Sequence, residues 1–378
     1  MSFEQFVEKA SERKEQTFED LEVPEAKIIV VGTGGAGNNT VTRLTEMGGV
    51  YGAETICMNT DKQHLRTTKA DKKLLIGYEL TRGLGAGGYP EVGKESALES
   101  KQEIKELVEG ASLVFLATGL GGGTGTGSAP VVAEIAKQSG AIVIGVTTMP
   151  FNMEKARIVK AEEGLLRLRE VSDTVIVIDN NKLVEYCPDL PLNKAFAVAD
   201  ELIATMIKGI SETITKPSLV NLDFADIRAI MSNGGVAMIG VGESNTKNRA
   251  EEAVRDALKH PLLEVDYRGA SGALLHITGG EDLTLSEVTY IGETVSENLD
   301  PKAQVIWGAR IDPEYSGKIR VITVLTGVHS PQVLGKLGRE KASEAMAAAR
   351  SGDRQMPLPQ MAKRKPALLK ELDIDYVF

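Results

Sequence analysis

The sequence predicts an α/β protein with two folded units joined by a long helix. Three observations lead to this fold class. Short, almost continuously apolar runs recur up to residue 179, one long helical pattern lies between residues 192 and 216, and a second series of strand-like and helical segments follows it. At about 150 residues per domain, a chain of 378 residues has room for two such units and for tails.

The first unit, residues 25–190, is expected to hold a parallel β-sheet covered by helices on both faces. The stretches between its apolar runs are long enough for helices, and strands buried on both faces read as continuous apolar runs. Ligands bind beyond the carboxyl ends of such strands, so the residues after each run are candidates for a site. The runs are KIIVVG, ETICMN, SLVFLAT, AIVIGVTT and TVIVID.

A long helix is predicted over residues 191–217, where apolar side chains recur every three or four residues until Pro217 ends the pattern. Residues 218–335 repeat shorter strand-like and helical patterns, which predicts a smaller mixed α/β C-terminal domain. Residues 1–24 form a charged tail or an added helix. Residues 336–378 read as a linker followed by LKELDIDYVF, whose apolar cluster is either a frayed end or a docking peptide.

The composition excludes several classes of protein. The chain has 43 Lys and Arg against 53 Asp and Glu, a net charge of -10, so it offers no general attraction for nucleic acid or an anionic membrane surface. Its two cysteines and four scattered histidines lack the spacing of a disulfide framework or a zinc site. No long apolar run or signal-type segment occurs. We therefore expect a cytoplasmic protein that neither binds nucleic acid nor inserts into a membrane, with no protein-built metal site.

A glycine-rich loop follows the first apolar run. Residues 32–37 match G-x-G-x-x-G at a strand-to-helix junction, where glycine allows a tight turn and the new helix offers its positive end to a phosphate. Asp61 follows the second run, about where a dinucleotide-binding protein keeps the acid that binds its ribose. Taken alone, this loop leaves a nicotinamide-dependent dehydrogenase open.

Two further glycine clusters indicate a larger phosphate group. The run that ends at Thr118 leads into GLGGGTGTGS, residues 119–128, whose glycines expose consecutive backbone amides before another helix. A structural turn does not need so many glycines. The cluster TRGLGAGG, residues 81–88, adds the cation Arg82. Three such loops at the ends of neighbouring strands predict a nucleoside triphosphate rather than a single pyrophosphate.

Two segments of the sequence resemble better-known nucleotide-binding motifs but depart from each at one essential position. Residues 88–94 spell G-x-x-x-x-G-K, but Glu95 stands where a P-loop needs Ser or Thr for Mg²⁺, and no strand precedes the segment. Asn181 and Lys182 resemble a guanine-reading Asn-Lys-x-Asp, but Val184 takes the place of the acid. Other residues must therefore recognise the base.

A polar cluster, NLDFADIR, follows the long helix at residues 221–228. Asn221, Asp223 and Asp226 could converge on one side of a helix that begins there. Two interpretations stay open. The acids are a helix N-cap with first-turn charges, or they orient an attacking water and accept its proton, which contributes roughly 10²- to 10⁴-fold in such reactions. The spacing does not show that these side chains reach the phosphate loops.

In these residues the chain resembles the tubulin superfamily and, within it, the FtsZ family. GGGTGTG at 121–127 and NLDFADIR at 221–228 carry the resemblance, and GGAGNN, NTDKQ, LTRGLGAGG, TMPF, AFAVADE and SNGGVAMIGVG extend it from about residue 27 to 335. GGAGNNT and SNGGVAMIGVG are most similar to the archaeal branch. The resemblance implies a Rossmann-like parallel-sheet GTPase domain at 25–190, a central connecting helix, and a C-terminal GTPase-activating domain at 218–335.

The resemblance also implies the nucleotide and the residues that bind it. The glycine loops would hold the phosphates of GTP or GDP, with Mg²⁺ on the β- and γ-phosphates bound mostly by phosphate and water. Glu154 and Arg157, three residues apart where the family usually has four, would reach the ribose and phosphates. Phe196 would cover the base and Asp200 would pair with guanine, which discriminates against adenine. The residues so implied are Gly34, Gly35, Ala36, Gly37, Asn38, Asn59, Gly121, Gly122, Gly123, Thr124, Gly125, Thr126, Gly127, Glu154, Arg157, Phe196 and Asp200.

By the same resemblance, the protein is expected to be a cell-division GTPase that assembles head to tail into protofilaments of the cytokinetic ring at the division site. Asn221, Asp223 and Asp226 would lie at the opposite end of the subunit and complete the GTP site of the next copy, so hydrolysis would need the polymer. Other division proteins and a membrane tether are implied as partners, with residues 368–378 as a candidate docking segment. The alternative is a GTP-binding cytoskeletal scaffold with little turnover, against which the two acids argue.

Overall fold

The computed structural model describes residues 26–215, 218–220, 223–231, 235–259 and 267–328. The predictions for residues 1–24 and 336–378 lie outside these ranges, as does Asn221. Within the described ranges, no helix combines the length and apolar character needed to span a membrane.

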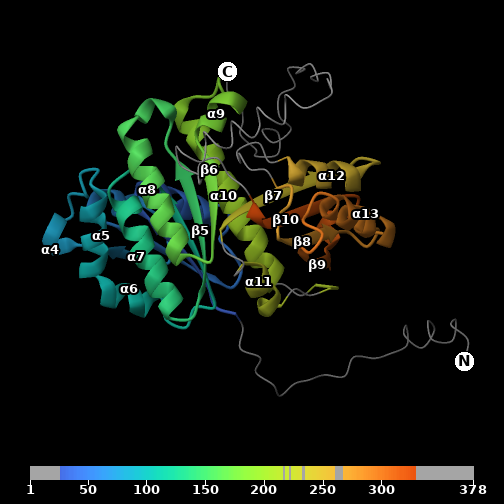
Figure 1. The fold of residues 1–378 in the computed structure, drawn as a ribbon, viewed down its shortest axis with the longest axis horizontal. Helices are drawn as coiled ribbons and strands as arrows, with labels where there is room; N and C mark the ends of the chain where they lie inside the picture. The colour runs from blue at the N-terminus through green and yellow to red at the C-terminus, as the bar shows by residue number, and fades with distance from the viewer. Residues whose placement is uncertain (1–25, 216–217, 221–222, 232–234, 260–266, 329–378) are drawn as a thin grey trace, which may run out of the picture.

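One continuous sheet of ten strands organises the described chain, in the order β3-β2-β1-β4-β5-β6-β7-β10-β8-β9 (Figure 1). The five apolar runs predicted before residue 180 are the parallel strands β1, β2, β4, β5 and β6, which confirms the α/β fold class. The strands are β1 Ile28–Thr33, β2 Ala53–Asn59, β3 Lys72–Leu75, β4 Leu113–Gly119, β5 Ile142–Met149, β6 Thr174–Asp179, β7 Val236–Ser244, β8 Gly272–Gly279, β9 Gln304–Ile311 and β10 Ile319–Val328.

Helices cover both faces of the parallel strands. The helices α5, α6 and α8 pack against α7, whereas α2 packs against α10. Two of the three glycine clusters lead from a strand into one of these helices, α2 after β1 and α7 after β4. The third, residues 81–88, lies between α4 and α5, so the prediction that it follows a strand end is wrong. The helices are α2 Gly34–Glu46, α3 Lys62–Thr67, α4 Tyr78–Thr81, α5 Pro90–Glu99, α6 Lys101–Val108, α7 Thr124–Gln138, α8 Ala156–Val171, α9 Asn181–Tyr186, α10 Leu192–Thr215, α11 Phe224–Met231, α12 Arg249–Leu258 and α13 Leu285–Ser296, with short 3-10 turns at Asn152–Glu154 and Pro313–Tyr315.

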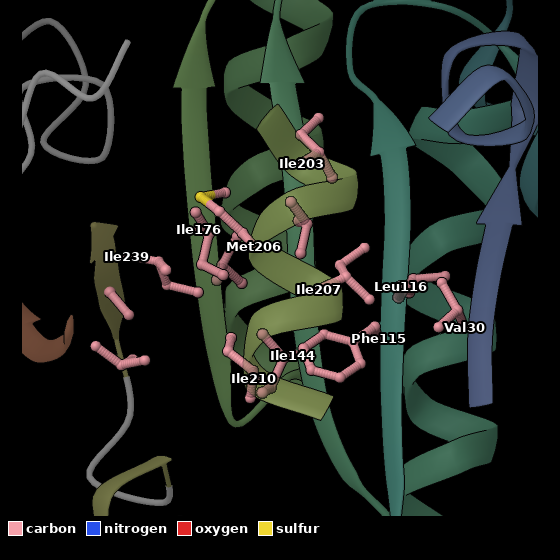
Figure 2. Close-up of a cluster of buried hydrophobic side chains, with 14 of the residues drawn as sticks. Val30, Phe115, Leu116, Ile144, Ile176, Ile203, Met206, Ile207, Ile210 and Ile239 are labelled. Atoms are coloured by element: carbon pink, nitrogen blue, oxygen red, sulfur yellow. The ribbon is translucent and has the colours of Figure 1, made fainter. Parts of the chain in front are cut away.

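The long helix predicted from the periodicity is α10, and its apolar stripe packs on the middle of the sheet. Figure 2 shows this stripe facing side chains from β4, β5, β6 and β7. Burial of each such side chain stabilises the fold by roughly 1.5–3 kcal/mol. The stripe comprises Ile203, Met206, Ile207 and Ile210, and the labelled side chains of the sheet that surround it are Val30, Phe115, Leu116, Ile144, Ile176 and Ile239, all of them buried.

The sheet changes character after β6. Only Val175 and Ile176 of β6 pair with β7, opposite Val236 and Ala237. The apolar stripe of α10 therefore packs across the place where these two strands share only two residue pairs. Beyond it, β10 runs antiparallel to both β7 and β8, while β8 and β9 are parallel. The helices α12 and α13 pack on each other beside these strands, away from α4 to α6 (Figure 1).

Candidate functional site

Two helices begin at the carboxyl edge of the parallel strands with their first amides uncapped. α2 starts at Gly34 and α7 at Thr124, and neither has a side-chain cap or an acidic residue in its first turn. The two starts lie against each other, because a Cβ on Gly34 would stand 2.7 Å from the backbone nitrogen of Gly125. Helix N-termini carry free N–H groups and a positive dipole end, so this paired start is suited to an anion such as a polyphosphate.

A pocket of about 460 Å³ opens beside the two helix starts. It brings together segments that follow β1, β4, β5 and β6, as the rule for carboxyl ends of parallel strands predicts. The implied binding residues that line it are Gly35, Ala36, Gly122, Gly123, Thr124, Gly125, Glu154, Arg157 and Phe196.

Other lining residues were not assigned as binding residues from the sequence, although Gly119 and Leu120 belong to the second glycine cluster and residues 148–151 form the TMPF motif. They are Gly119, Leu120, Thr148, Pro150, Phe151, Met153 and Asn180. Residues 148–151 end β5 and continue beyond it, and Asn180 is the first residue after β6. These positions follow the carboxyl ends of β5 and β6, where ligands bind in parallel sheets, so the strand ends are the sequence signal that points to them.

Packing within the protein does not require glycine at positions 35 and 122. A Cβ on either residue would meet no atom within 4 Å, although both line the pocket. By contrast, a Cβ on Gly125 would stand 2.5 Å from the Thr118 hydroxyl, and one on Gly123 would stand 2.8 Å from Ala86. Packing explains the latter two glycines, whereas the former two leave room for a ligand that approaches the backbone.

The remaining implied glycine-loop residues support the loops from behind and do not line the pocket. The amide of Gly121 donates to the Thr126 hydroxyl at 2.9 Å, which closes the loop on the helix. A Cβ on Gly127 would collide with the carbonyl oxygen of Pro90. These supporting residues are Gly34, Gly37, Gly121, Thr126 and Gly127.

Asn38 and Asn59 also lie behind the pocket, where both side chains are buried. In the amide orientation that satisfies its neighbours, Asn38 donates to the carbonyl of Gly32 at 2.8 Å and accepts from Nδ2 of Asn59 at 3.0 Å. The pair therefore joins the carboxyl ends of β1 and β2 beneath the first loop.

The third glycine cluster flanks the pocket. Lys160 of α8 donates to the carbonyl of Gly88 at 2.7 Å, which holds the end of this loop. Arg82 is exposed and is not among the lining residues. Asp61 caps α3 by accepting from the amides of Gln63 and His64, at 2.8 and 3.0 Å. The position that a dehydrogenase uses for its ribose acid thus has a local structural role here.

The charged lining of the pocket is one ion pair. Nη1 of Arg157 lies 2.6 Å from Oε2 of Glu154, and the other oxygen of Glu154 accepts from the amide of Phe151 at 3.1 Å. The side chain of Arg157 is 63% exposed and that of Glu154 is 23% exposed. The carboxylate is therefore anchored, whereas the guanidinium can turn toward an anion in the pocket.

An aromatic pair closes the other end of the pocket. The rings of Phe151 and Phe196 meet edge to face, with centroids 5.7 Å apart and planes at 63°. Phe196 is still 39% exposed, which leaves a ring face for a planar ligand. Oδ1 of Asn180 is buried without a hydrogen-bond partner in the described ranges, which costs about 1–3 kcal/mol. A ligand with an N–H or O–H donor would satisfy it.

Asp200 lies on α10 one helical turn after Phe196, is partly exposed, and is not among the residues that line the pocket. Its Oδ1 accepts from the hydroxyl of Thr40 on α2, at 2.9 Å. Burial raises the pKa of Asp200 to about 6, and the Thr40 hydrogen bond and the charge of Arg43 oppose that rise. Such a carboxylate suits a base that presents two N–H groups.

Asp223 and Asp226 lie at the opposite edge of the sheet. Their side chains cap α11 reciprocally: the amide of Asp226 donates to Oδ1 of Asp223 at 2.8 Å, and the amide of Asp223 donates to Oδ2 of Asp226 at 3.1 Å. The N-cap interpretation is therefore correct for the geometry. A catalytic role remains compatible with it, because the cap fixes the direction of both carboxylates.

The helix α11 crosses the amino ends of β5 and β6. Arg228 donates to the carbonyl of Gly140, just before β5, at 3.3 Å, and Thr174 at the start of β6 donates to the carbonyl of Met231 at 2.9 Å. Figure 1 shows α11 and α9 at opposite ends of these strands. At ~3.3 Å per residue, the 8 residues of β5 separate the acids from the pocket by about 25 Å. Within one chain, the acids cannot reach a ligand in the pocket.

Comparisons with known proteins identify the family to which the chain belongs. Residues 27–188 match the GTPase domain of the Tubulin/FtsZ family, and residues 235–329 match the C-terminal domain of the FtsZ family. The cell division protein FtsZ 2 of Methanocaldococcus jannaschii is 62% identical over 318 residues, 83% of this chain and 83% of that protein. FtsZ 1 of the same organism is 56% identical over 321 residues, 85% of this chain and 88% of that protein.

Solved structures show the same fold. An empty FtsZ dimer of M. jannaschii has a TM-score of 0.74 at 54% identity, over 86% of this chain and 93% of that one. A GTPγS-bound protofilament of CetZ2 from Haloferax volcanii shares the fold at 23% identity, with a TM-score of 0.71 over 86% of this chain and 99% of that one. The paired helix starts, the aromatic end of the pocket and these matches have one explanation: the chain belongs to the tubulin/FtsZ family of GTPases, within its FtsZ branch.

Proposed function

We propose that this protein hydrolyses GTP at a contact between two copies of the chain, and that the resulting head-to-tail protofilaments form the cytokinetic ring at the division site. One observation carries the proposal. The pocket lies at the carboxyl edge of the parallel strands and the paired acids of α11 lie at the amino edge, about 25 Å away along the 8 residues of β5. A second copy of the chain can bring its acids to the pocket, which the acids of the same copy cannot reach.

Binding would use the features of the pocket in order along the nucleotide. The first amides of α2 and α7 would hold the phosphates, and Arg157 would turn from Glu154 toward them. The ring of Phe196 would cover the base, Asn180 would accept from it, and Asp200 would accept from the two N–H groups that guanine presents and adenine lacks. Leaving such a buried acceptor unpaired rejects the wrong base by about 10⁴-fold.

We also propose that Mg²⁺ binds together with the phosphates of the nucleotide. Glu154 is the carboxylate among the lining residues, and it is occupied by Arg157 and the Phe151 amide. In the described part of the chain, no group of three or more His, Cys, Asp or Glu is placed to hold a metal ion. This donor set fits a cation bound mostly by phosphate oxygens and water, so no residue is assigned to it. When bound, Mg²⁺ would neutralise charge on the β- and γ-phosphates.

Hydrolysis would use Asp223 and Asp226 of the neighbouring copy, together with Asn221. The reciprocal cap aims the two carboxylates, which would orient a water at the γ-phosphate and take its proton. Each copy would have one pocket and one set of acids at opposite ends, so the contact repeats without closing and produces a filament. The dimer of the M. jannaschii relative supports self-association. We also propose other division proteins and a membrane tether as partners, with residues 368–378 as the docking segment.

The experiment that tests the proposal measures GTP hydrolysis per subunit and light scattering in the same samples, over a range of protein concentrations with Mg²⁺. We expect both signals to begin at one threshold concentration. A constant rate per subunit without scattering would mean that the GTPase is self-contained. Scattering without turnover would favour the alternative, a GTP-binding scaffold.

A further inference from the structure

We infer that Thr40 is a positioning residue for base recognition, whose hydroxyl holds the Asp200 carboxylate in the orientation and charge state that accept from guanine. The inference rests on the proposed function, in which Asp200 reads the base. It concerns a residue of the phosphate-binding helix α2 and a residue of the central helix α10, 160 positions apart in the sequence.

The geometry places the Thr40 hydroxyl between the two halves of the site. Thr40 is 3% exposed. Its Oγ1 lies 2.9 Å from Oδ1 of Asp200 and 3.2 Å from the carbonyl oxygen of Ala36, one turn earlier in α2. Ala36 lines the pocket near the phosphate end, and Phe196 precedes Asp200 by one turn at the base end. The hydroxyl therefore joins the helix that would hold the phosphates to the acid that would read the base.

A hydroxyl has one hydrogen, and here it has two acceptors. When Asp200 is ionised, the hydroxyl donates to the carboxylate, because a charged acceptor forms a bond roughly twice as strong as a neutral one. When Asp200 is protonated, its own O–H can donate to Thr40, and the Thr40 hydroxyl turns to the Ala36 carbonyl. Only the first arrangement leaves Asp200 with acceptor capacity for two guanine N–H groups.

The charged groups around Asp200 make the hydrogen bond from Thr40 important for its charge state. In the described ranges, Arg43 of α2 is the charged group that favours the ionised form, and its guanidinium also pairs with Glu201, the next residue of α10. The charge of Arg43 is therefore shared between two acids. Burial raises the pKa of Asp200 to about 6, and the Thr40 hydrogen bond opposes that rise, so losing the Thr40 donor would raise the pKa further.

Other threonines of α2 provide the matched control. Thr45 also donates to the carbonyl four residues earlier, Val41, at 2.9 Å, and its second acceptor is the carbonyl of Lys69 at 3.3 Å rather than Asp200. If the Thr40 hydroxyl served only to bond back along the helix, removing either hydroxyl would have similar consequences. Thr40→Val and Thr45→Val keep the β-branched shape while removing the hydroxyl, and Thr40→Ser returns it.

The test uses the full chain below its assembly concentration and measures the dissociation constants of GTP, ITP and ATP between about pH 5 and pH 8. ITP lacks the 2-amino group that guanine donates. We expect Thr40→Val to weaken GTP by about tenfold, the loss typical of a hydrogen bond to a charged group, with little change for ATP. We also expect the loss of GTP affinity at low pH to begin at a higher pH in Thr40→Val. Thr40→Ser should restore both the affinity for GTP and its pH dependence. Thr45→Val should match the parent chain.

Two results separate failure of this inference from failure of the proposed function. Equal weakening of GTP and ATP in Thr40→Val, with an unchanged pH dependence, would mean that Thr40 only packs, and the inference would be overturned. Asp200→Asn tests the underlying role independently, because an amide can donate to the 2-carbonyl of xanthine and should shift preference from GTP to XTP. An unchanged preference in that variant would remove Asp200 from base recognition altogether. Titration of the nucleotide's own phosphate is common to all variants and cancels in the comparison.

Discussion

The backbones of Gly34 and Gly125 touch where α2 and α7 begin: a Cβ added to Gly34 would lie 2.7 Å from the Gly125 nitrogen. Only glycine at position 34 permits this approach, because its φ is +72° and no side chain intervenes. The contact brings two uncapped helix starts together at the pocket. The nucleotide is thus expected to be held by two helix dipoles at once, and not by a single P-loop.

We predict that Gly122→Ala and Gly35→Ala fold normally but bind GTP about tenfold or more weakly, equivalent to ~1.4 kcal/mol. A methyl group at either position meets no protein atom within 4 Å but occupies pocket space that a phosphate would use. Gly127→Ala is the matched contrast, because its methyl group would collide with the Pro90 carbonyl and cost about 1–3 kcal/mol of folding free energy. Thermal melts with titrations of GTP distinguish the two kinds of loss, and a destabilised Gly122→Ala would contradict the assignment.

We predict that Asp226→Asn keeps GTP affinity and loses most turnover, by roughly 10²-fold or more. Asp226 lies on α11, at the edge of the sheet opposite the pocket, so its charge should not affect binding. Nucleotide titrations and steady-state hydrolysis check the two properties separately. Binding that falls in parallel with turnover would rule out this division of roles.

Mixing two inactive variants should restore activity. In an equimolar mixture of Asp226→Asn and Gly122→Val, the pocket of the first meets the intact acids of the second, so we expect part of the hydrolysis to return. The rate of the mixture against the sum of the separate rates is the measurement. No recovery in mixtures that still assemble would argue that each copy completes its own site.

Asp200 should give GTP binding and folding stability opposite dependences on pH. Burial raises its pKa from 3.8 to about 6 in the fold, so its contribution to the stability of the nucleotide-free protein is complete below 3.8 and is lost as pH rises through 6. Base pairing needs the ionised form, so GTP affinity should fall as pH drops below 6. Melting temperatures with and without GTP across this range check both signs, and Asp200→Asn should flatten both.

His276 should limit stability in acid. The side chain is 3% exposed on β8, both ring nitrogens lack partners in the described ranges, and burial together with the charge of Arg310 lowers its pKa to about 4. A lowered pKa means that the neutral ring's contribution is present above 6.5 and is lost as pH falls through 4. His276→Leu should therefore equal or exceed the parent in stability at neutral pH and lose less on acidification. Urea unfolding at several pH values compares them, and identical acid sensitivity would contradict the prediction.

The sequence by itself determined five of the parallel strands, the long helix and the position of the first two glycine-rich loops. These features are encoded within short segments: continuous apolar runs for buried parallel strands, a repeat of three and four residues up to Pro217 for α10, and clustered glycines at strand ends. Local backbone preference and side-chain periodicity are sufficient for them, because each acts over only a few residues.

Only the tertiary structure decided which glycines of those loops pack against other segments of the protein and which have open space beside them. Gly127 meets Pro90 and Gly123 meets Ala86, residues that the order of strands brings close, whereas Gly35 and Gly122 meet nothing. No local pattern separates these cases.

The same holds for the distance between the acids of α11 and the pocket, and for the bond between Thr40 and Asp200. Each depends on which segments the sheet order places together and which it holds apart at its two edges. Contacts between residues far apart in the chain are set by packing of the whole fold, and no short segment of sequence contains that information.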